Sequence, residues 1–227
     1  MKINTKKIVK LAQDSLVLAF VFVFLISLQV LAATTPTFNQ DIVAGSISVD
    51  IVDASGVTVA APAVTFEEAT FSFSTQDTTG SFAPTAERIR ASNPTGTEEW
   101  TVNLAASATT DTWTDGGSNE YDFNDAGGYV DDGATTDVDA FGGEMTVDPS
   151  GGTLTEVDSC GVVGISKGTE DAFEEGVTDS IDIMVADGTA TAYCQYDFIG
   201  DAGNILQKIP AGQAAASYSI DMTVTIQ

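Results

Sequence analysis

The chain has 227 residues, no histidine, and 33 acidic against 8 basic side chains, which gives a formal net charge of −25. A surface of that charge repels nucleic acid and anionic lipid, so neither is expected as a partner. Hydrophobic residues make up 43% of the chain, enough for a packed core and too many for wholesale disorder. Without histidine there is no Ser-His or Cys-His pair for nucleophilic catalysis, and we expect no enzyme.

The N-terminal segment has the pattern of an export signal. Four lysines precede an apolar run over residues 16–33, and small residues at Val30-Leu31-Ala32 suit a signal peptidase. We expect residues 1–32 to be a signal-peptide helix, cleaved after Ala32, and residues 33–227 to be one domain. The protein would then be secreted or held at the cell surface, and would meet a membrane only before cleavage. An uncleaved anchor is the alternative, because the run is nearly long enough to span a bilayer.

The region after residue 33 has almost no helical periodicity. Short runs that alternate apolar and polar residues are separated by Gly, Asp, Asn, Ser and Pro. These features predict an all-β fold, an antiparallel β-sandwich of immunoglobulin-like or jelly-roll-like type, with a long acidic insertion loop. The predicted strands are 42–52, 69–75, 87–92, 100–106, 143–147, 161–165, 180–186, 190–198 and 218–227, and one helical turn is expected over 170–176.

For two of these strands, the pattern leaves open whether they contact their own domain or another subunit. The first strand pairs either within its own domain or with a neighbouring subunit, to which it would be donated. Arg88 and Arg90 lie two apart and project from the same strand face. They form either an internal salt bridge to a neighbouring acidic strand or a docking point for an acidic patch on another subunit.

The predicted insertion loop, residues 111–143, is rich in Asp and Gly and poor in aliphatic residues. Calcium prefers six to eight oxygen ligands on a flexible, glycine-containing loop. No EF-hand motif is present, so a calcium site here would be irregular, and a solvated acidic loop is the alternative. The candidate ligands are Asp122, Asn124, Asp125, Asp131, Asp132, Asp137 and Asp139.

The chain contains two cysteines, Cys160 and Cys194, and both lie in the part predicted to be exported. An exported chain with two cysteines predicts one disulfide bond between them. A metal site is not expected here, because two thiolates without histidine supply too few ligands.

Two stretches carry a family resemblance. They are residues 91–104, with the sequence ASNPTGTEEWTVNL, and residues 209–212, IPAG, followed by the final strand 218–227. Both resemble secreted surface proteins of the WxL type, which have a turn before a Trp-led strand and a Pro-Ala-Gly turn before the last strand. The resemblance implies a β-rich domain that associates with the cell wall. The ending also resembles sandwich-type pilus subunits.

Two functions follow from these patterns. The first is a non-catalytic structural subunit of a surface layer or extracellular filament of a microbial cell, which self-associates and is stabilised by calcium. The second is a binding module for cell-wall polymer or polysaccharide. Its ligand-binding residues would be Trp113, Tyr121 and Tyr129, since aromatic rings stack on sugars and nearby carboxylates recognise hydroxyl groups.

Overall fold

The computed structural model describes residues 10, 13–16, 40, 42–43, 45–125, 142–190 and 193–227. The chain divides into two compact units, Met1–Ile42 and Val43–Gln227. In the first unit, Lys10 and residues 13–16 are helical. No helix within the described ranges is both long and apolar enough to cross a membrane. Most of the expected signal peptide lies outside the described residues, so its assignment stays a prediction.

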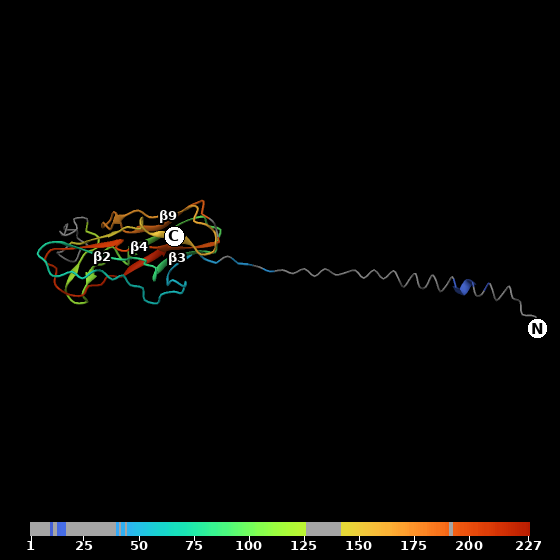
Figure 1. Ribbon diagram of the computed structural model, residues 1–227, viewed down its shortest axis with the longest axis horizontal. Coiled ribbons are helices and arrows are strands. Elements are labelled where there is room, and N and C mark those ends of the chain that lie inside the picture. Colours follow the sequence, from blue (N-terminus) through green and yellow to red (C-terminus); the bar gives the residue numbers. More distant parts are fainter. Residues whose placement is uncertain are drawn as a thin grey trace, which may run out of the picture. The chain divides into compact units, whose positions relative to one another are not determined.

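The described part of the second unit is built from β-strands, which Figure 1 shows in packed layers. Every pairing between them is antiparallel. The strands are β1 (Ser48–Val52), β2 (Gln76–Gly80), β3 (Arg88–Asn93), β4 (Glu99–Ala106), β5 (Trp113–Thr114), β6 (Glu120–Tyr121), β7 (Glu144–Val147), β8 (Thr153–Glu156), β9 (Ile165–Lys167), β10 (Asp171–Ala172), β11 (Ile181–Asp187), β12 (Cys194–Ile199), β13 (Ile205–Ile209) and β14 (Met222–Ile226).

Among the described residues, the strands form three four-stranded sheets and one two-stranded hairpin. The sheet orders are β1-β3-β12-β8, β14-β4-β11-β9 and β10-β7-β13-β2, and β5 pairs with β6. The first two sheets face each other across the core, where the ring of Trp100 on β4 lies 5.9 Å from that of Tyr196 on β12. The predicted antiparallel β-sandwich is therefore confirmed.

The alternation in β3 shows how the sequence produces this core. Ile89, Ala91 and Asn93 are buried, while Arg88 and Arg90 project from the other face. Because side chains alternate across a strand, one face of β3 joins the core and the other meets polar groups of β12. The pairing of β1 with β3 lies within the same chain, in the register Ser48↔Ser92 to Val52↔Arg88, so the described part of the first strand pairs in its own domain.

The two arginines form an ion cluster on the outer face of that sheet. Arg90 binds Asp197 of β12 through two hydrogen bonds, Nε to Oδ1 at 2.7 Å and Nη2 to Oδ2 at 2.9 Å. Arg88 adds a longer contact of 3.5 Å to the same carboxylate. The register places Arg90 directly opposite Asp197. The internal salt bridge is thus the alternative that the structure favours.

Several local predictions were wrong. Residues 69–75 form a coil that bends at Phe73 and Ser74 and not a strand, although Phe71 and Phe73 alternate with polar residues; both rings are exposed. Residues 161–165 are largely a turn, because Gly161 and Gly164 adopt positive φ angles of 74° and 77°. The helical turn expected over 170–176 is absent, since Asp171 and Ala172 pair with β7 instead.

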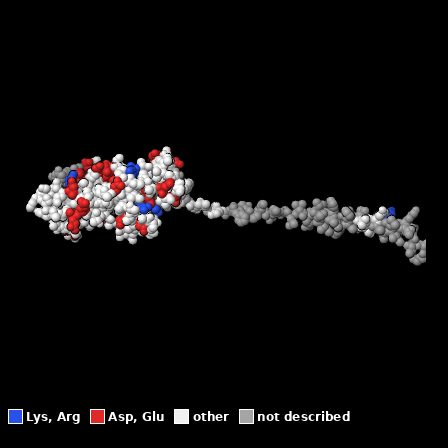
Figure 2. Space-filling view, in the orientation of Figure 1, with Lys and Arg blue, Asp and Glu red and all other residues white. Residues whose placement is uncertain are grey.

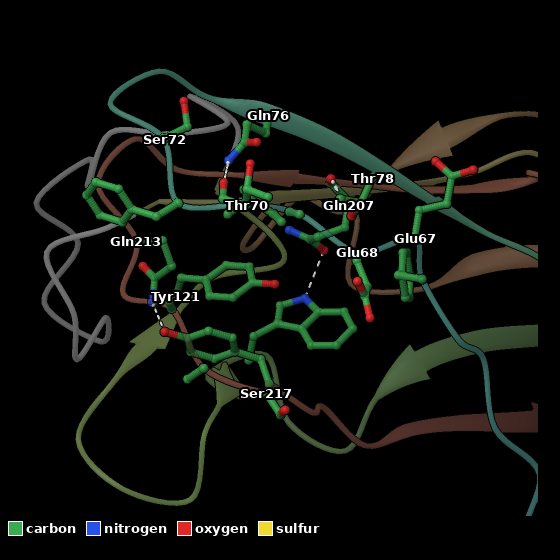
Figure 3. Close-up of a pocket in the computed structure, with 18 of the residues that line it drawn as sticks. Glu67, Glu68, Thr70, Ser72, Gln76, Thr78, Tyr121, Gln207, Gln213 and Ser217 are labelled. Atoms are coloured by element: carbon green, nitrogen blue, oxygen red, sulfur yellow. Dashed lines mark hydrogen bonds between the residues drawn. The ribbon is translucent and has the colours of Figure 1, made fainter.

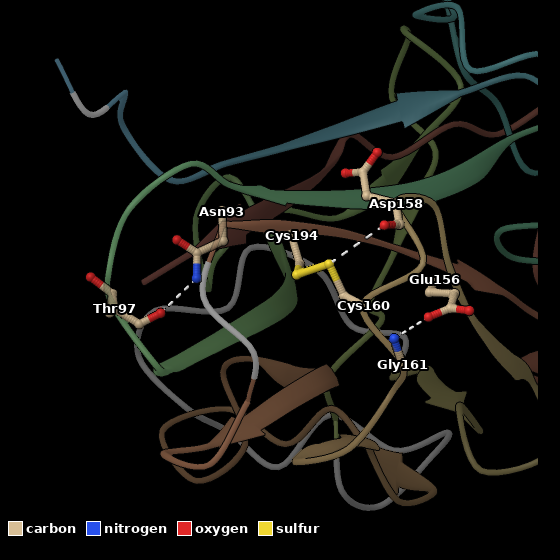
Figure 4. The surroundings of a disulfide bond; sticks show 7 residues. All are labelled: Asn93, Thr97, Glu156, Asp158, Cys160, Gly161 and Cys194. Atoms are coloured by element: carbon tan, nitrogen blue, oxygen red, sulfur yellow. Dashed lines mark hydrogen bonds between the residues drawn. A yellow bond between two sulfur atoms is a disulfide. The ribbon is translucent and has the colours of Figure 1, made fainter. Parts of the chain in front are cut away.

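The predicted disulfide between Cys160 and Cys194 is confirmed. It joins the loop after β8 to the start of β12, as Figure 4 shows, with the two Cα atoms 6.2 Å apart. The backbone N–H of Gly161 donates to the carboxylate of Glu156, and Asn93 Nδ2 donates to Thr97 O at 2.6 Å in the adjoining turn. The bond and these turn contacts hold one end of the sheet β1-β3-β12-β8 together.

Candidate functional site

A pocket of about 560 Å³ opens between two coil segments of the second unit. One wall is the segment 64–72, and the other is the segment 213–218 between β13 and β14 (Figure 3). The floor is formed by β2, β13 and the β5–β6 hairpin, through Thr78, Gln207, Trp113 and Tyr121. Its volume lies within the range of roughly 300–1,000 Å³ that is typical of small-ligand sites.

Aromatic rings cover much of the floor. Trp113 and Tyr121 face each other across the β5–β6 pair and stack with centroids 5.9 Å apart and planes inclined by 8°. Phe66 meets Trp113 edge-on at 5.4 Å, and Tyr218 meets Tyr121 edge-on at 5.1 Å. Stacked and edge-to-face geometries are the favoured arrangements of aromatic pairs, so the cluster is rigid as well as apolar.

A buried glutamine holds the tryptophan in place. Trp113 Nε1 donates to Gln207 Oε1 at 2.8 Å, the hydrogen bond drawn in Figure 3. The Nε2 group of Gln207 donates in turn to the carbonyl oxygens of Asp122 and Lys208. The polar edge of the indole is therefore satisfied inside the protein, which fixes the orientation of its ring at the floor.

The second wall is closed by its own hydrogen bonds. Gln213 Nε2 donates to the Tyr218 hydroxyl at 2.8 Å, and that hydroxyl donates to Ala214 O at 2.8 Å. The two walls are tied together where Gly212 N donates to Ser72 O at 2.8 Å. Burial raises the pKa of the Tyr121 hydroxyl above its ordinary value, and the neighbouring Tyr218 raises it further. Tyr121 therefore stays neutral and keeps its hydroxyl proton.

Carboxylates are the charged groups of the pocket. Glu67 and Glu68 lie on the first wall and are exposed, and Figure 3 shows them on the opposite side from Gln213. None of the lining residues in the described ranges is Lys or Arg. Asp and Glu are scattered over the visible face of the second unit with few basic residues between them (Figure 2).

No protein family, curated protein or solved structure matches this chain. The resemblance to WxL-type proteins therefore stays a prediction.

A second, smaller hollow of about 360 Å³ adjoins the first. The two share the wall residues Val64, Phe66, Trp113 and Tyr218. Its lining is mostly apolar and reaches core residues such as Leu104 of β4.

Two of the three predicted ligand-binding aromatics meet in this site. Trp113 and Tyr121 lie at the pocket floor, and both are buried, 8% and 4% exposed, so they are not platforms on an open loop. Tyr129 lies outside the described residues. The sequence did not point to Phe66, Gln207 or Tyr218, because they are far from the acidic segment and no spacing rule links them to it.

The predicted metal ligands are only partly described. Asp122, Asn124 and Asp125 are buried next to the β5–β6 hairpin, and Asn124 Nδ2 donates to Thr109 O at 2.8 Å. Asp131, Asp132, Asp137 and Asp139 lie outside the described residues. Within the part of the chain that is described, no three acidic or cysteine side chains gather closely enough to hold a metal ion. Calcium binding remains a prediction that depends on the rest of the acidic segment.

Proposed function

We propose that this protein is an exported, non-catalytic binding module that holds sugar units of a polysaccharide in the pocket between segments 64–72 and 213–218. One observation carries the proposal: the Trp113–Tyr121 stack, oriented by Gln207, forms the floor of a pocket with carboxylate and carboxamide walls. The buried Trp113–Tyr121 stack shapes the floor, and the exposed Phe71 ring at the rim can pack against the C–H face of a sugar. Carboxylates and amides bind the hydroxyl groups around the edge of the sugar.

Two neighbouring hollows that share wall residues would suit a chain-like ligand. A monosaccharide would need only the larger pocket, whereas the shared wall at Phe66 and Trp113 offers contacts to a second unit. The rings and Gln207 are already packed and hydrogen-bonded, so little side-chain freedom is lost on binding. Cell-wall glycan and secreted polysaccharide are the polymers that an exported protein of this kind would meet.

The proposal is tested by a binding assay with one rim variant and a matched control. Phe71 lines the pocket and is 52% exposed, so Phe71→Ala removes an aromatic contact without opening the core. We expect affinity for insoluble wall glycan in a pull-down to fall about two- to tenfold. Tyr193→Ala removes an aromatic side chain that is 69% exposed but does not line the pocket, and should leave binding unchanged. No binding by the unaltered protein, or equal losses in both variants, would reject the proposal.

A second candidate is the structural subunit of a surface layer or filament. The observation that favours it is β14, which lies at the edge of its sheet and pairs with β4 alone among the described strands. Unpaired backbone groups on an edge strand can recruit another chain by strand addition. Electron microscopy of the mature protein tests this candidate. Regular filaments or sheets would support it, and monomeric particles across a range of salt and calcium concentrations would count against it.

A further inference from the structure

We infer that the protein forms a two-fold symmetric dimer in which β14 pairs antiparallel with β14 of a second copy. The surface is the outer edge of β14, and the partner that fits it is the same edge of another molecule. This inference does not depend on saccharide binding. It also differs from the filament candidate, because an interface built from the same surface on both subunits closes on itself.

The backbone of β14 carries the first argument. Thr101 N donates to Gln227 O at 2.9 Å, and Gln227 N donates to Thr101 O at 3.0 Å. The register continues through Thr225↔Asn103. Because hydrogen-bonded and non-hydrogen-bonded pairs alternate along an antiparallel ladder, the odd-numbered residues of β14 bond to β4 and the even-numbered residues face the outer edge. These even-numbered residues are Met222, Val224 and Ile226.

No described residue forms a hydrogen bond to the backbone groups of β14 that face the outer edge. Two other edge strands are covered by segments of the same chain. Val59 N donates to Ile51 O of β1 at 2.8 Å, and Glu67 N donates to Thr79 O of β2 at 2.9 Å. The donors and acceptors on the outer edge of β14 are therefore available to a second strand.

The charge pattern explains why that second strand can be another copy. Charged side chains on edge strands discourage edge-to-edge pairing. Among the described residues, β14 is the only edge strand of the three four-stranded sheets without a charged residue. The others contain Asp50 in β1, Asp77 in β2, Glu156 in β8, Lys167 in β9 and Asp171 in β10. In a chain with 33 acidic residues, this neutral edge is where two copies can meet without opposing carboxylates.

The side chains of β14 are also self-complementary. Thr223 and Thr225 are exposed, whereas the even-numbered residues are half-buried and apolar. Antiparallel pairing centred on Val224 places Thr223 opposite Thr225 of the second copy, and threonine pairs stabilise neighbouring strands. On the inner face, Met222 comes to lie opposite Ile226 of the second copy. Both faces of the joint sheet therefore match across the two-fold axis.

The interface is small, since each copy contributes a strand of five residues. We therefore expect a weak dimer that depends on protein concentration. The formal net charge of −25 on each chain opposes association, and salt screens that repulsion. Dimerisation should thus increase with ionic strength.

The test is analytical ultracentrifugation of the mature protein at low and high sodium chloride, in chelator and without glycan. The glutamate variant, Thr223→Glu/Thr225→Glu, places like charges opposite each other in the dimer but changes only exposed positions of the monomer. The lysine variant, Thr223→Lys/Thr225→Lys, does the same with positive charges. The control Thr109→Glu/Thr110→Glu adds the same charge at exposed positions beyond β4. Circular dichroism verifies that every variant is folded.

We expect the unaltered protein to dimerise and the glutamate variant to associate about tenfold more weakly or less. Mixing the glutamate and lysine variants should restore a dimer, because opposite charges then face each other. The control should stay within about twofold of the unaltered protein. A strictly monomeric unaltered protein at both salt concentrations, equal weakening in the control, or no recovery on mixing would overturn the inference. Species larger than a dimer would overturn the closed two-fold arrangement.

Hydrogen exchange gives a readout at single residues. The amides of Thr223 and Thr225 should be protected in monomer and dimer alike, because they bond to β4. The amides of Met222, Val224 and Ile226 should gain protection only at concentrations where the dimer forms. A dimer that leaves these three amides unprotected would show that β14 is not the interface.

Discussion

At the scale of single residues, Asp197 is the clearest case of a charge that the fold depends on. Its side chain is 2% exposed and lies against the guanidinium groups of Arg88 and Arg90. The hydrogen bond from Arg90 to Asp197 raises the pKa of Arg90. Asp197→Asn would leave Arg90 without its bidentate partner in a half-buried position. We expect the free energy of unfolding to fall by about 2–4 kcal/mol, measured by urea denaturation.

The matched control for this change is Asp201→Asn, which removes the same charge from an exposed loop position. Its effect should stay within about 0.5 kcal/mol. Equal unfolding midpoints for the two variants would show that the cluster around Asp197 is a surface ion pair with little effect on stability.

The pocket tyrosine gives a prediction at alkaline pH. Burial raises the pKa of Tyr121 above its ordinary value of 10.0, so the folded state favours the neutral form. The stability that this contributes is fully present below the unfolded-state pKa and is lost as the pH rises beyond it. Above about pH 10, the free energy of unfolding of Tyr121→Phe should therefore fall less steeply with rising pH than that of the unaltered protein. Phenolate absorbance measured alongside near-ultraviolet circular dichroism checks this. Ionisation of all five tyrosines near their ordinary pKa in a protein that stays folded would contradict it.

At the scale of elements, the disulfide ties two segments of the second unit together. It closes a loop across 34 positions, from the segment after β8 to β12. On the chain-entropy account, a loop of this length stabilises the fold by about 3–4 kcal/mol. In urea denaturation, the free energy of unfolding of the double variant Cys160→Ser/Cys194→Ser should be lower by about that much. Reductant should lower the free energy of unfolding of the unaltered protein and leave that of the double variant unchanged. An unchanged midpoint in both comparisons would mean that the bond adds nothing to stability.

The elements also show what could be predicted from the sequence. Strands such as β4, β11 and β14 were expected, because their apolar residues alternate or run together over five or more positions. β2 was missed, since Gln76-Asp77-Thr78-Thr79-Gly80 is almost wholly polar and is recruited by pairing with β13. Long-range pairing decided its structure where local propensity did not.

The pocket was still harder to predict than the strands. Trp113 and Tyr121 were identified as ligand-binding candidates because both aromatics lie in the acidic segment. The walls come from segments about 150 residues apart in the chain, which only the packing of the sheets brings together. Nothing in the spacing of Phe66, Gln207 and Tyr218 indicates that they surround the same indole ring.

At the scale of the whole molecule, the acidic surface predicts a response to calcium as well as to salt. Sodium chloride alone should raise the melting temperature, because it screens the self-repulsion of a chain with net charge −25. If the acidic segment binds calcium, chelation at constant ionic strength should lower the melting temperature further, by mass action on the folded state. Magnesium serves as the control cation. Identical melting curves in calcium, magnesium and chelator would show that calcium does not stabilise the folded protein.

The saccharide-binding claim is tested most directly by the indole N–H signals of the protein. The chain has two tryptophans, so a nitrogen–proton correlation spectrum of the labelled protein contains two such signals. Trp113 lies at the pocket floor and donates to Gln207, whereas Trp100 is buried between the sheets near Tyr196. Titration with a glucosamine or N-acetylglucosamine trimer should shift the Trp113 signal in a saturable way and leave that of Trp100 in place. A bound oligomer that shifts neither signal, or that shifts the Trp100 signal alone, would contradict binding at this pocket.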